Sequence, residues 1–302
     1  MSEANSLQFP ANIQTVLMVF NPARSGANQA AQTASRILHA AQIKTLQYNY
    51  QPSEIHFRDP DAHFHELAFE ADVILVLGGD GTILGVARQI AENPRPLMGI
   101  NLGGFGFLTS SAPYELETAL QSLLAGSCRV IERYLLEARV IRHNGADDEV
   151  VFTSYALNEA LVTLAQPGRL LRIWVGEHED TALTYRGDGL IVATPTGSTG
   201  HSLSAGGPIL DPDLPALIIT PVSPHSLFNR PLVIHGDSDL PLWFDEGTEQ
   251  LRLILDGQIH TELLARDRIR IRRSQQTIPT LTLPDRNFTQ VLRLKFNLGH
   301  PN

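Results

Sequence analysis

The 302-residue sequence contains one cysteine, two lysines and no apolar run long enough to cross a membrane. Cys128 alone can form neither an internal disulfide nor a multi-cysteine metal site, which is typical of proteins in reducing compartments. The longest uncharged apolar runs, such as residues 73–77, fall far short of the ~20 residues that a membrane-spanning helix needs. Residues 1–10 lack the basic-then-apolar order of a secretory signal. We therefore expect a cytoplasmic protein, with Cys128 buried in the core as a small apolar residue.

Positive charge is scarce as well. The 23 basic residues stand against 32 acidic ones, which gives a net charge of −9, and only Lys44 and Lys295 are lysines. Nucleic-acid backbones and anionic membranes both require clustered Lys and Arg, so this balance argues against either partner and favours small-molecule ligands. A phosphate group bound by this chain must therefore be held by arginine, by backbone N–H groups or by a metal ion.

Two regions of different character follow one another along the chain. Up to about residue 127, short apolar runs alternate with helix-like stretches, the pattern of βαβ units around a parallel sheet. Beyond Cys128, strands of alternating polarity such as 135–142 and 268–272 predict a second, β-rich domain. The predicted strands of the first region are 16–20, 43–50, 73–77 and one that ends at Asn101, and its predicted helices are 27–41, 63–69, 82–90 and 114–125. The turn signals of the second region are Asn144-Gly145, Asp188-Gly189, His235-Gly236 and Asp256-Gly257.

A glycine-rich loop, Gly78-Gly79-Asp80-Gly81, joins the buried strand 73–77 to a helix. Glycines bring bare N–H groups close to an oxyanion, and the helix N-terminus adds a favourable dipole, so the loop suits a phosphate. It lacks the Gly-Lys-Ser/Thr ending of a P-loop. A carboxylate in a phosphate loop suffers repulsion unless it holds a metal or accepts a proton, which makes Asp80 a catalytic candidate. The alternative is that Asp80 only caps the following helix.

The Gly-Gly-Asp-Gly-Thr segment at 78–82 resembles a signature shared by NAD kinases, lipid kinases of the diacylglycerol and sphingosine type, and phosphofructokinases. In these families a carboxylate and backbone amides handle a transferred phosphoryl group. The segment 21–26, Asn-Pro-Ala-Arg-Ser-Gly, is similar to the nucleotide-side loop of the lipid kinases. A lipid or other small-molecule kinase therefore stays an alternative at this point.

Motifs further along the chain resemble the NAD kinases. Residues 99–109 are similar to the second motif of that family, in which glycines admit the dinucleotide and Phe107 would pack against its adenine. Asn158-Glu159 matches the family's Asn-acidic pair, which hydrogen-bonds the NAD. Residues 185–210 resemble the long family motif at nearly every position. By that resemblance the NAD is contacted by Asp188, at its nicotinamide end, and by Thr196, Ser198, Thr199 and Ser204.

Two positions of the long motif carry finer information. Most NAD kinases have Ala-Tyr where this chain has Gly200-His201, and His201 can still stack and hydrogen-bond, although its charge can change near neutral pH. Arg186 stands where family members differ between Arg and Gly, and the resemblance implies that arginine goes with a preference for NAD over NADH. A dinucleotide-binding module without activity, marked by Gly200-His201, is the remaining alternative.

The resemblance implies a two-domain fold: a Rossmann-like α/β domain at 1–127, on which the tail 278–302 packs, and a β-sandwich at 128–277. It implies a homodimer or homotetramer that phosphorylates the adenosine 2'-hydroxyl of NAD with Mg-ATP, with Mg²⁺ carried by ATP and Asp80 as the catalytic base. His225, and His63 with His65, are not expected to act as a base or as metal ligands. The expected binding residues are Gly78, Gly79, Gly81, Phe107, Asn158, Glu159, Arg186, Asp188, Thr196, Ser198, Thr199, Gly200, His201 and Ser204.

Overall fold

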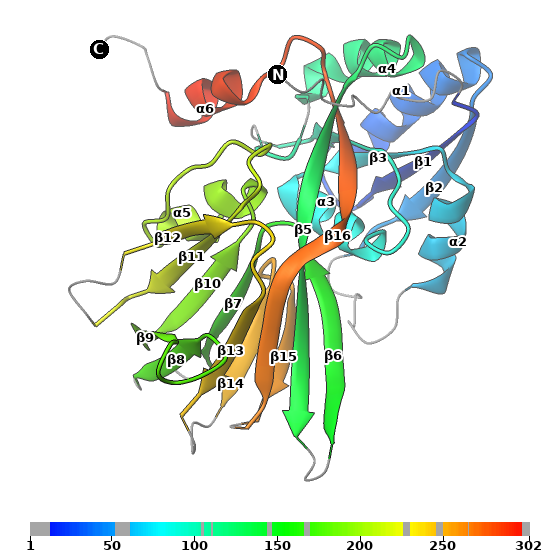
Figure 1. Ribbon diagram of the computed structural model, residues 1–302. Coiled ribbons are helices and arrows are strands. Elements are labelled where there is room, and N and C mark those ends of the chain that lie inside the picture. The colour runs from blue at the N-terminus through cyan, green and yellow to red at the C-terminus, as the bar shows by residue number, and fades with distance from the viewer. Residues whose placement is uncertain are drawn as a thin grey trace. The chain divides into compact units, whose positions relative to one another are not determined.

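The structure is a computed structural model that describes residues 13–51, 61–103, 106–109, 111–143, 147–165, 170–225, 230–245, 250–264 and 266–297. The chain divides into two compact units. The first unit is Met1–Arg133 with Ile278–Asn302, and the second is Tyr134–Thr277. Two long strands, β5 (Arg129–His143) and β16 (Arg268–Thr282), contribute one end to each unit. Figure 1 shows both strands as continuous ribbons.

A parallel sheet forms the centre of the first unit. Its strands lie in the order β2-β1-β3-β4, followed by the C-terminal end of β16. Every residue of β1, β3 and β4 is buried, which explains why their sequences are continuous apolar runs rather than alternating ones. The sheet confirms the α/β pattern expected from the sequence. The bounds are β1 Thr15–Phe20, β2 Lys44–Asn49, β3 Val73–Gly78 and β4 Leu97–Asn101.

Helices pack on this sheet and close its core. α1 (Ala27–Ala40) and α4 (Leu116–Leu124) lie together, and their buried residues share one apolar cluster with β1, β3 and β4 (Figure 1). Cys128 belongs to this cluster, and burial raises the pKa of its thiol to about 11, so it behaves as the apolar residue expected. The other helices of this unit are α2 Ala62–Glu70, α3 Asp80–Gln89, α6 Phe288–Phe296 and the 3₁₀ turn η1 Pro113–Glu115.

The second unit is a β-sandwich, as the resemblance implied. One antiparallel sheet has the order β12-β11-β10-β7-β14-β15. Strands of the other sheet include β9, β8, β13 and the hairpin of β5 with β6. The bounds are β6 Asp148–Ala156, β7 Glu159–Leu164, β8 Leu171–Val175, β9 Leu183–Gly187, β10 Gly189–Ala193, β11 Ala216–Val222, β12 Leu232–His235, β13 Leu240–Phe244, β14 Leu251–Leu255 and β15 Ile259–Leu263, with the short helices η2 Thr196–Thr199 and α5 His201–Ser204.

Several local predictions can be compared with these elements. The predicted strands and helices of the first region are confirmed to within a few residues, except that 3₁₀ turn η1 precedes α4. β5 and β16 are much longer than the predicted 135–142 and 268–272, because each continues from one unit into the other. The sequence analysis missed α6, although Asn287 and Gln290 form a capping box at its start. Among the described residues, no helix is long and apolar enough to cross a membrane.

Candidate functional site

Three loops of the first unit leave the sheet at the same edge. They follow the C-terminal ends of β1, β3 and β4, which are adjacent parallel strands in register: Phe20 lies opposite Leu77, and Leu77 opposite Ile100. Ligands of open α/β sheets bind at this edge, outside the carboxyl ends of the strands. The loops are residues 21–26, residues 79–81 and residues 102–109, of which Gly104 and Phe105 lie outside the described residues.

Asp80 links two of these loops. It is the first residue of α3, and Gly79 precedes it in extended conformation. Its carboxylate accepts hydrogen bonds from the backbone N–H of Phe107 (3.0 Å to Oδ2) and of Leu108 (3.3 Å to Oδ1). The side chain is half-buried. The N-cap position belongs to Gly79, and the carboxylate of Asp80 reaches across to the neighbouring loop.

Gly106 makes room for that carboxylate. A Cβ added at Gly106 would lie 2.1 Å from Oδ1 of Asp80 and 2.5 Å from Oγ1 of Thr109, far inside van der Waals contact. Each carboxylate oxygen keeps a second lone pair after accepting one N–H, so Asp80 is oriented and can still accept a proton or a cation.

A half-buried arginine that the sequence analysis did not select also belongs to this edge. A Cβ added at Gly79 would lie 3.1 Å from Nη1 of Arg24, and one added at Gly103 would lie 2.8 Å from its Nη2. The guanidinium of Arg24 therefore lies against the backbone of both glycine loops. The available signal was its place in the turn after a buried parallel strand, next in the sheet to the strand that carries Asp80.

Phe107 lies against the C-terminal helix. Its half-buried ring is 5.6 Å from the ring of Phe296, centroid to centroid, and Nζ of Lys295 lies 5.5 Å from its centroid. Both partners come from α6, which the sequence analysis missed. The ring of Phe107 is thus accessible at this edge in the company of an aromatic and a cationic side chain, a combination that can stack on a planar ring.

In the second unit, Asn158 and Glu159 sit at the start of β7 and are held there by Asp256. The Asp256 carboxylate accepts hydrogen bonds from the backbone N–H groups of Leu157 (2.9 Å), Asn158 (2.7 Å) and Glu159 (3.1 Å). Sequence reasoning placed Asp256 in a turn and did not select it as a site residue. Its role is to fix the backbone of the acidic pair, so that the two side chains project in a defined direction.

Glu159 is a buried acid that has no cationic partner among the residues that the structure describes. It is 6% exposed, and burial, followed by repulsion from Asp256, raises the pKa of its carboxyl to about 8, against the effect of the His201 backbone N–H bond. Oε2 of Glu159 and Oδ1 of Asn158 are buried without a hydrogen-bond partner among the described residues. Buried polar atoms are normally paired, so these two are available to a ligand. The site is therefore a neutral acid and an amide with free hydrogen-bonding capacity.

The loop 194–204 packs on this pair through glycines. A Cβ at Gly197 would lie 2.1 Å from the carbonyl oxygen of Asn158, and one at Gly200 would lie 3.1 Å from Oε2 of Glu159. Thr194 fixes the turn, because its hydroxyl donates to the Leu157 carbonyl (2.6 Å) and accepts the Gly197 N–H (3.0 Å).

The predicted hydroxyl groups of this loop differ in what they can reach. Ser198 is fully buried, and its hydroxyl bonds both the carbonyl and the N–H of Leu210. Thr196 is buried, and the hydroxyl of Thr199 donates to the Thr196 carbonyl (3.3 Å). His201 and Ser204 are exposed on α5. The structure therefore uses Ser198 to hold the loop together, whereas His201 and Ser204 face solvent.

Arg186 and Asp188 lie away from the acidic pair. Both are exposed at the turn between β9 and β10, where Gly187 packs so closely that a Cβ would lie 2.5 Å from the carbonyl oxygen of Val222. β10 pairs with β7 so that Gly189 lies opposite Thr163 and Ala193 opposite Glu159. Four residue steps of ~3.4 Å therefore separate the two ends of this paired stretch, about 14 Å in all. The structure does not bring Arg186 and Asp188 together with Glu159.

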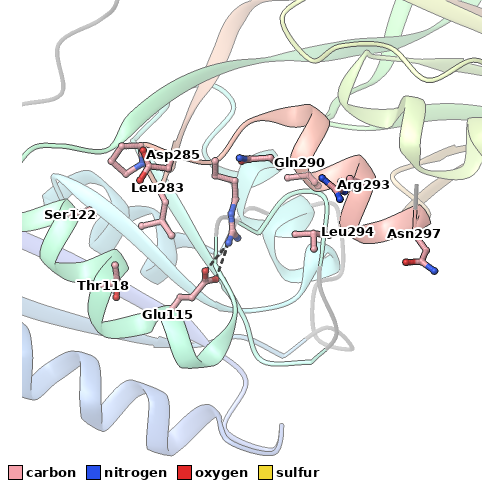
Figure 2. Close-up of a pocket in the computed structure, with 12 residues that line it drawn as sticks. Glu115, Thr118, Ser122, Leu283, Asp285, Gln290, Arg293, Leu294 and Asn297 are labelled. Atoms are coloured by element: carbon pink, nitrogen blue, oxygen red, sulfur yellow. Dashed lines mark hydrogen bonds and ion pairs between the residues drawn. The ribbon is translucent and has the colours of Figure 1, made fainter. Parts of the chain in front are cut away.

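A further pocket of the first unit lies between α4 and α6. Arg286 and Glu115 both line it and pair with each other (2.8 and 3.1 Å). Gln290, Arg293 and Leu294 of α6 line it as well (Figure 2). None of the residues selected from the sequence lines it. Among the described residues, no group of three or more His, Cys, Asp or Glu side chains could hold a metal ion. His63 and His65, which were not expected to ligate metal, lie on α2, where the ring of His63 is 6.4 Å from that of Tyr48 and the ring of His65 is 5.9 Å from that of Phe64.

Comparisons with known proteins agree on one family. Residues 16–128 match the model of the ATP-NAD kinase N-terminal domain, and residues 157–283 match that of the ATP-NAD kinase C-terminal domain. The chain is 43% identical over 226 residues to an NAD kinase of Rhodopirellula baltica, covering 75% of this chain and 71% of the relative. It is 40% identical over 229 residues to an NAD kinase of Geobacter metallireducens, covering 76% and 80%.

Solved structures share the fold. A yeast NADH kinase in complex with NADH superposes with a TM-score of 0.81 at 23% identity, covering 96% of this chain and 89% of the other. An NAD kinase from Archaeoglobus fulgidus in complex with ATP gives a TM-score of 0.70 at 24% identity, covering 94% and 98%. At these identities the structures establish the fold alone.

Proposed function

Because this chain belongs to the NAD kinase family and is thereby a phosphotransferase that phosphorylates NAD with ATP, we propose that Asp80 is the base of the reaction and that the second unit binds NAD. The observation that supports the proposal is the position of the Asp80 side chain. Its carboxylate is oriented by the N–H groups of Phe107 and Leu108 at the sheet edge where phosphate-binding loops gather. A carboxylate held in this way is ready to accept a proton without reorganisation.

The mechanism follows from how charge is balanced during phosphoryl transfer. The backbone N–H groups of residues 78–81 receive the ATP phosphates, and Asp80 accepts the proton of the adenosine 2'-hydroxyl. The hydroxyl oxygen attacks the terminal phosphorus as the bond from that phosphorus to the bridging oxygen breaks, and ADP leaves. Mg²⁺ enters as part of the substrate Mg-ATP and neutralises phosphate charge. Carboxylate and phosphate oxygens are the ligands that Mg²⁺ prefers, so the half-buried Asp80 fits such an ion as neighbour.

Recognition of NAD is assigned to two places in the second unit. Asn158 and the neutral Glu159 together offer hydrogen-bond donors and two acceptor atoms, Oδ1 and Oε2, that are buried without partners among the described residues. Such a pair suits ribose hydroxyls and an adenine amine. The exposed His201 replaces the tyrosine usual in the family at the same loop. Arg186 and Asp188, at the other end of β10, contact the nicotinamide end, and Arg186 favours NAD over NADH. Phe107 packs against an adenine ring.

The first experiment is incubation of the purified chain with Mg-ATP and NAD, with NADP read by an NADP-specific dehydrogenase. Asp80→Asn keeps the size of the side chain and removes its basicity, so kcat should fall about 10²-fold or more. Glu92→Gln removes one charge from an exposed position near α3 and should leave kcat unchanged. An Asp80→Asn variant with near-native kcat would show that the carboxylate only holds the loops together.

The proposal extends to the assembly and the compartment of the protein. We expect a homodimer or homotetramer in the cytoplasm, by analogy with the family and because the single cysteine is buried. Size-exclusion chromatography with light scattering measures the first expectation. A monomeric, fully active protein would contradict it.

A further inference from the structure

Arg24 lies in a turn whose conformation is fixed by its own hydrogen bonds. The Asn21 side chain accepts the Ala23 N–H (2.9 Å), and the Asn21 carbonyl accepts the Arg24 N–H (3.0 Å). The Arg24 carbonyl then accepts the N–H of Ala27, the first residue of α1 (3.1 Å). Gly26, at φ +78°, permits the reversal into the helix. The backbone of Arg24 is therefore placed before any ligand arrives.

The guanidinium of Arg24 is directed at the phosphate loop. It lies beside Gly79 and Gly103, where an added Cβ would lie 3.1 Å from Nη1 and 2.8 Å from Nη2. Arg24 is half-buried, and its guanidinium forms no ion pair or hydrogen bond with any residue that the structure describes. Gly79 is the immediate neighbour of Asp80, so a cation stands beside the catalytic loop without being neutralised by the carboxylate.

Two other partly buried arginines of the chain have carboxylate partners. Arg142 pairs with Asp267 through two hydrogen bonds of 2.8 and 2.7 Å, and Arg286 pairs with Glu115. A half-buried cation without such a partner loses hydration and gains nothing in return, unless an anion joins it. The planar fork of arginine matches a phosphate with two parallel hydrogen bonds, and such charge-assisted bonds are among the stronger ones in proteins.

We propose that Arg24 binds the terminal phosphate of ATP and balances its charge beside Asp80 during transfer. This rests on the proposed function of the glycine loop. The turn after β1 thereby supplies a permanent cation to the phosphate site, whereas the glycines of residues 78–81 supply only N–H groups. Because Arg24 acts on the ATP side, its loss changes ATP handling and leaves NAD recognition by the second unit intact.

The test compares Arg24→Ala and Arg24→Lys with the unchanged protein in steady-state assays and in Mg-ATP binding by calorimetry. Arg24→Ala should raise the KM and Kd for Mg-ATP, or lower kcat, by about 10- to 100-fold, the range for a hydrogen-bonded charge, with the KM for NAD within about 2-fold. Arg24→Lys keeps the positive charge but loses the planar guanidinium, so its constants for Mg-ATP should lie between those of Arg24→Ala and those of the unchanged protein. Arg36→Ala, which removes the same charge from an exposed position on α1, should match the unchanged protein.

A folding defect is separated from a binding defect by two further readings. Thermal unfolding should show similar transitions for all variants, and added guanidinium ion should restore part of the ATP turnover of Arg24→Ala. If the unchanged protein makes no NADP, the proposed function fails and Arg24 loses its role with it. If the unchanged protein is active and Arg24→Ala has native kinetics for ATP, or only a raised KM for NAD, then Arg24 does not bind the ATP phosphate.

Discussion

The two units place a carboxylate against backbone N–H groups in different ways. In the first unit, Asp80 accepts N–H bonds from Phe107 and Leu108 and stays half-buried. In the second unit, Asp256 accepts bonds from three consecutive N–H groups and is 6% exposed. The first arrangement orients a group that remains reachable, whereas the second uses up the carboxylate to hold a chain segment. The more exposed carboxylate can therefore react with a ligand, whereas the buried one has a structural role.

Glycines mark the same difference. Gly106 leaves space for the side chain of Asp80, and Gly197 leaves space for the backbone carbonyl of Asn158. A methyl group at the first position should disturb the chemical step, and one at the second should disturb the binding of NAD. Substitutions at these two glycines give the sharpest test of whether the units divide the work in this way.

Gly106→Ala should have the largest effect. The added methyl would lie 2.1 Å from Oδ1 of Asp80, so the carboxylate must move away from its hydrogen bonds to Phe107 and Leu108. A displacement of this size at a reacting group costs about 10²-fold in rate, so kcat should fall by that order while the KM for NAD changes little. Steady-state assays with both substrates varied measure this. An unchanged kcat would mean that the seat of Asp80 does not limit the reaction.

Gly197→Ala should act on NAD instead. Its methyl would lie 2.1 Å from the carbonyl oxygen of Asn158 and would push the acidic pair away from the loop. Overpacking of this kind costs about 1–3 kcal/mol, so we expect the KM for NAD to rise about 10-fold with the KM for ATP unchanged. A fall in kcat equal to that of Gly106→Ala would contradict the division between the two units.

Glu159→Gln should change how stability depends on pH. The carboxyl of Glu159 has an ordinary pKa of 4.5 when unfolded and about 8 in the folded chain. Between these values the unfolded chain has released the proton and the folded chain has kept it, so stability falls as pH rises from about 4.5 to about 8. Glutamine cannot ionise, so the variant does not lose this stability. Its free energy of unfolding relative to the unchanged protein should rise by on the order of 1–3 kcal/mol at pH 9 and change little at pH 4.

The measurement is chemical unfolding of both proteins at these two pH values. Glu179→Gln, at an exposed position of the same unit, is the matched control and should not alter the pH dependence. Parallel curves for Glu159→Gln and the unchanged protein would show that Glu159 titrates normally and that the binding site is charged.

Arg186→Gly should have the smallest effect. Exposed charges contribute about 1 kcal/mol or less, so the ratio of kcat/KM for NAD to that for NADH should fall only a few-fold. The direction comes from the family resemblance. Electrostatics alone acts the other way, because NAD carries one more positive charge than NADH at the nicotinamide. Assays with both dinucleotides decide between the two, and a ratio that rises on substitution would favour the electrostatic argument.

Some strands and helices could be predicted from the sequence and others could not, each for a physical reason. The buried strands β1, β3 and β4 were found because both faces of a covered parallel sheet must be apolar, which leaves continuous runs in the sequence. The lengths of β5 and β16 were not found, because their polarity pattern changes where they pass from one unit to the other. Helix α6 was missed, and none of its residues is buried, so no buried apolar face marks it in the sequence.

The site residues divide in the same manner. Asp80 and Glu159 were selected because a carboxylate beside glycines or beside an asparagine leaves a motif in the sequence. Ser198 was selected with them, although its hydroxyl is buried against Leu210. Arg24 and Asp256 were not selected, since each acts on residues more than fifty positions away along the chain.

By itself, the sequence determined the family, the two-domain architecture and the glycine loop, because each of these is encoded in residues that are close together in the chain. Only the tertiary structure decided that Asp80 is held by the loop after β4, that Arg24 lies between two glycine loops, and that Glu159 is buried above Asp256. Distance, burial and partnership between remote segments exist only after the chain has folded. They also determine which carboxylate is charged, which cation is free and which hydroxyl is already in use.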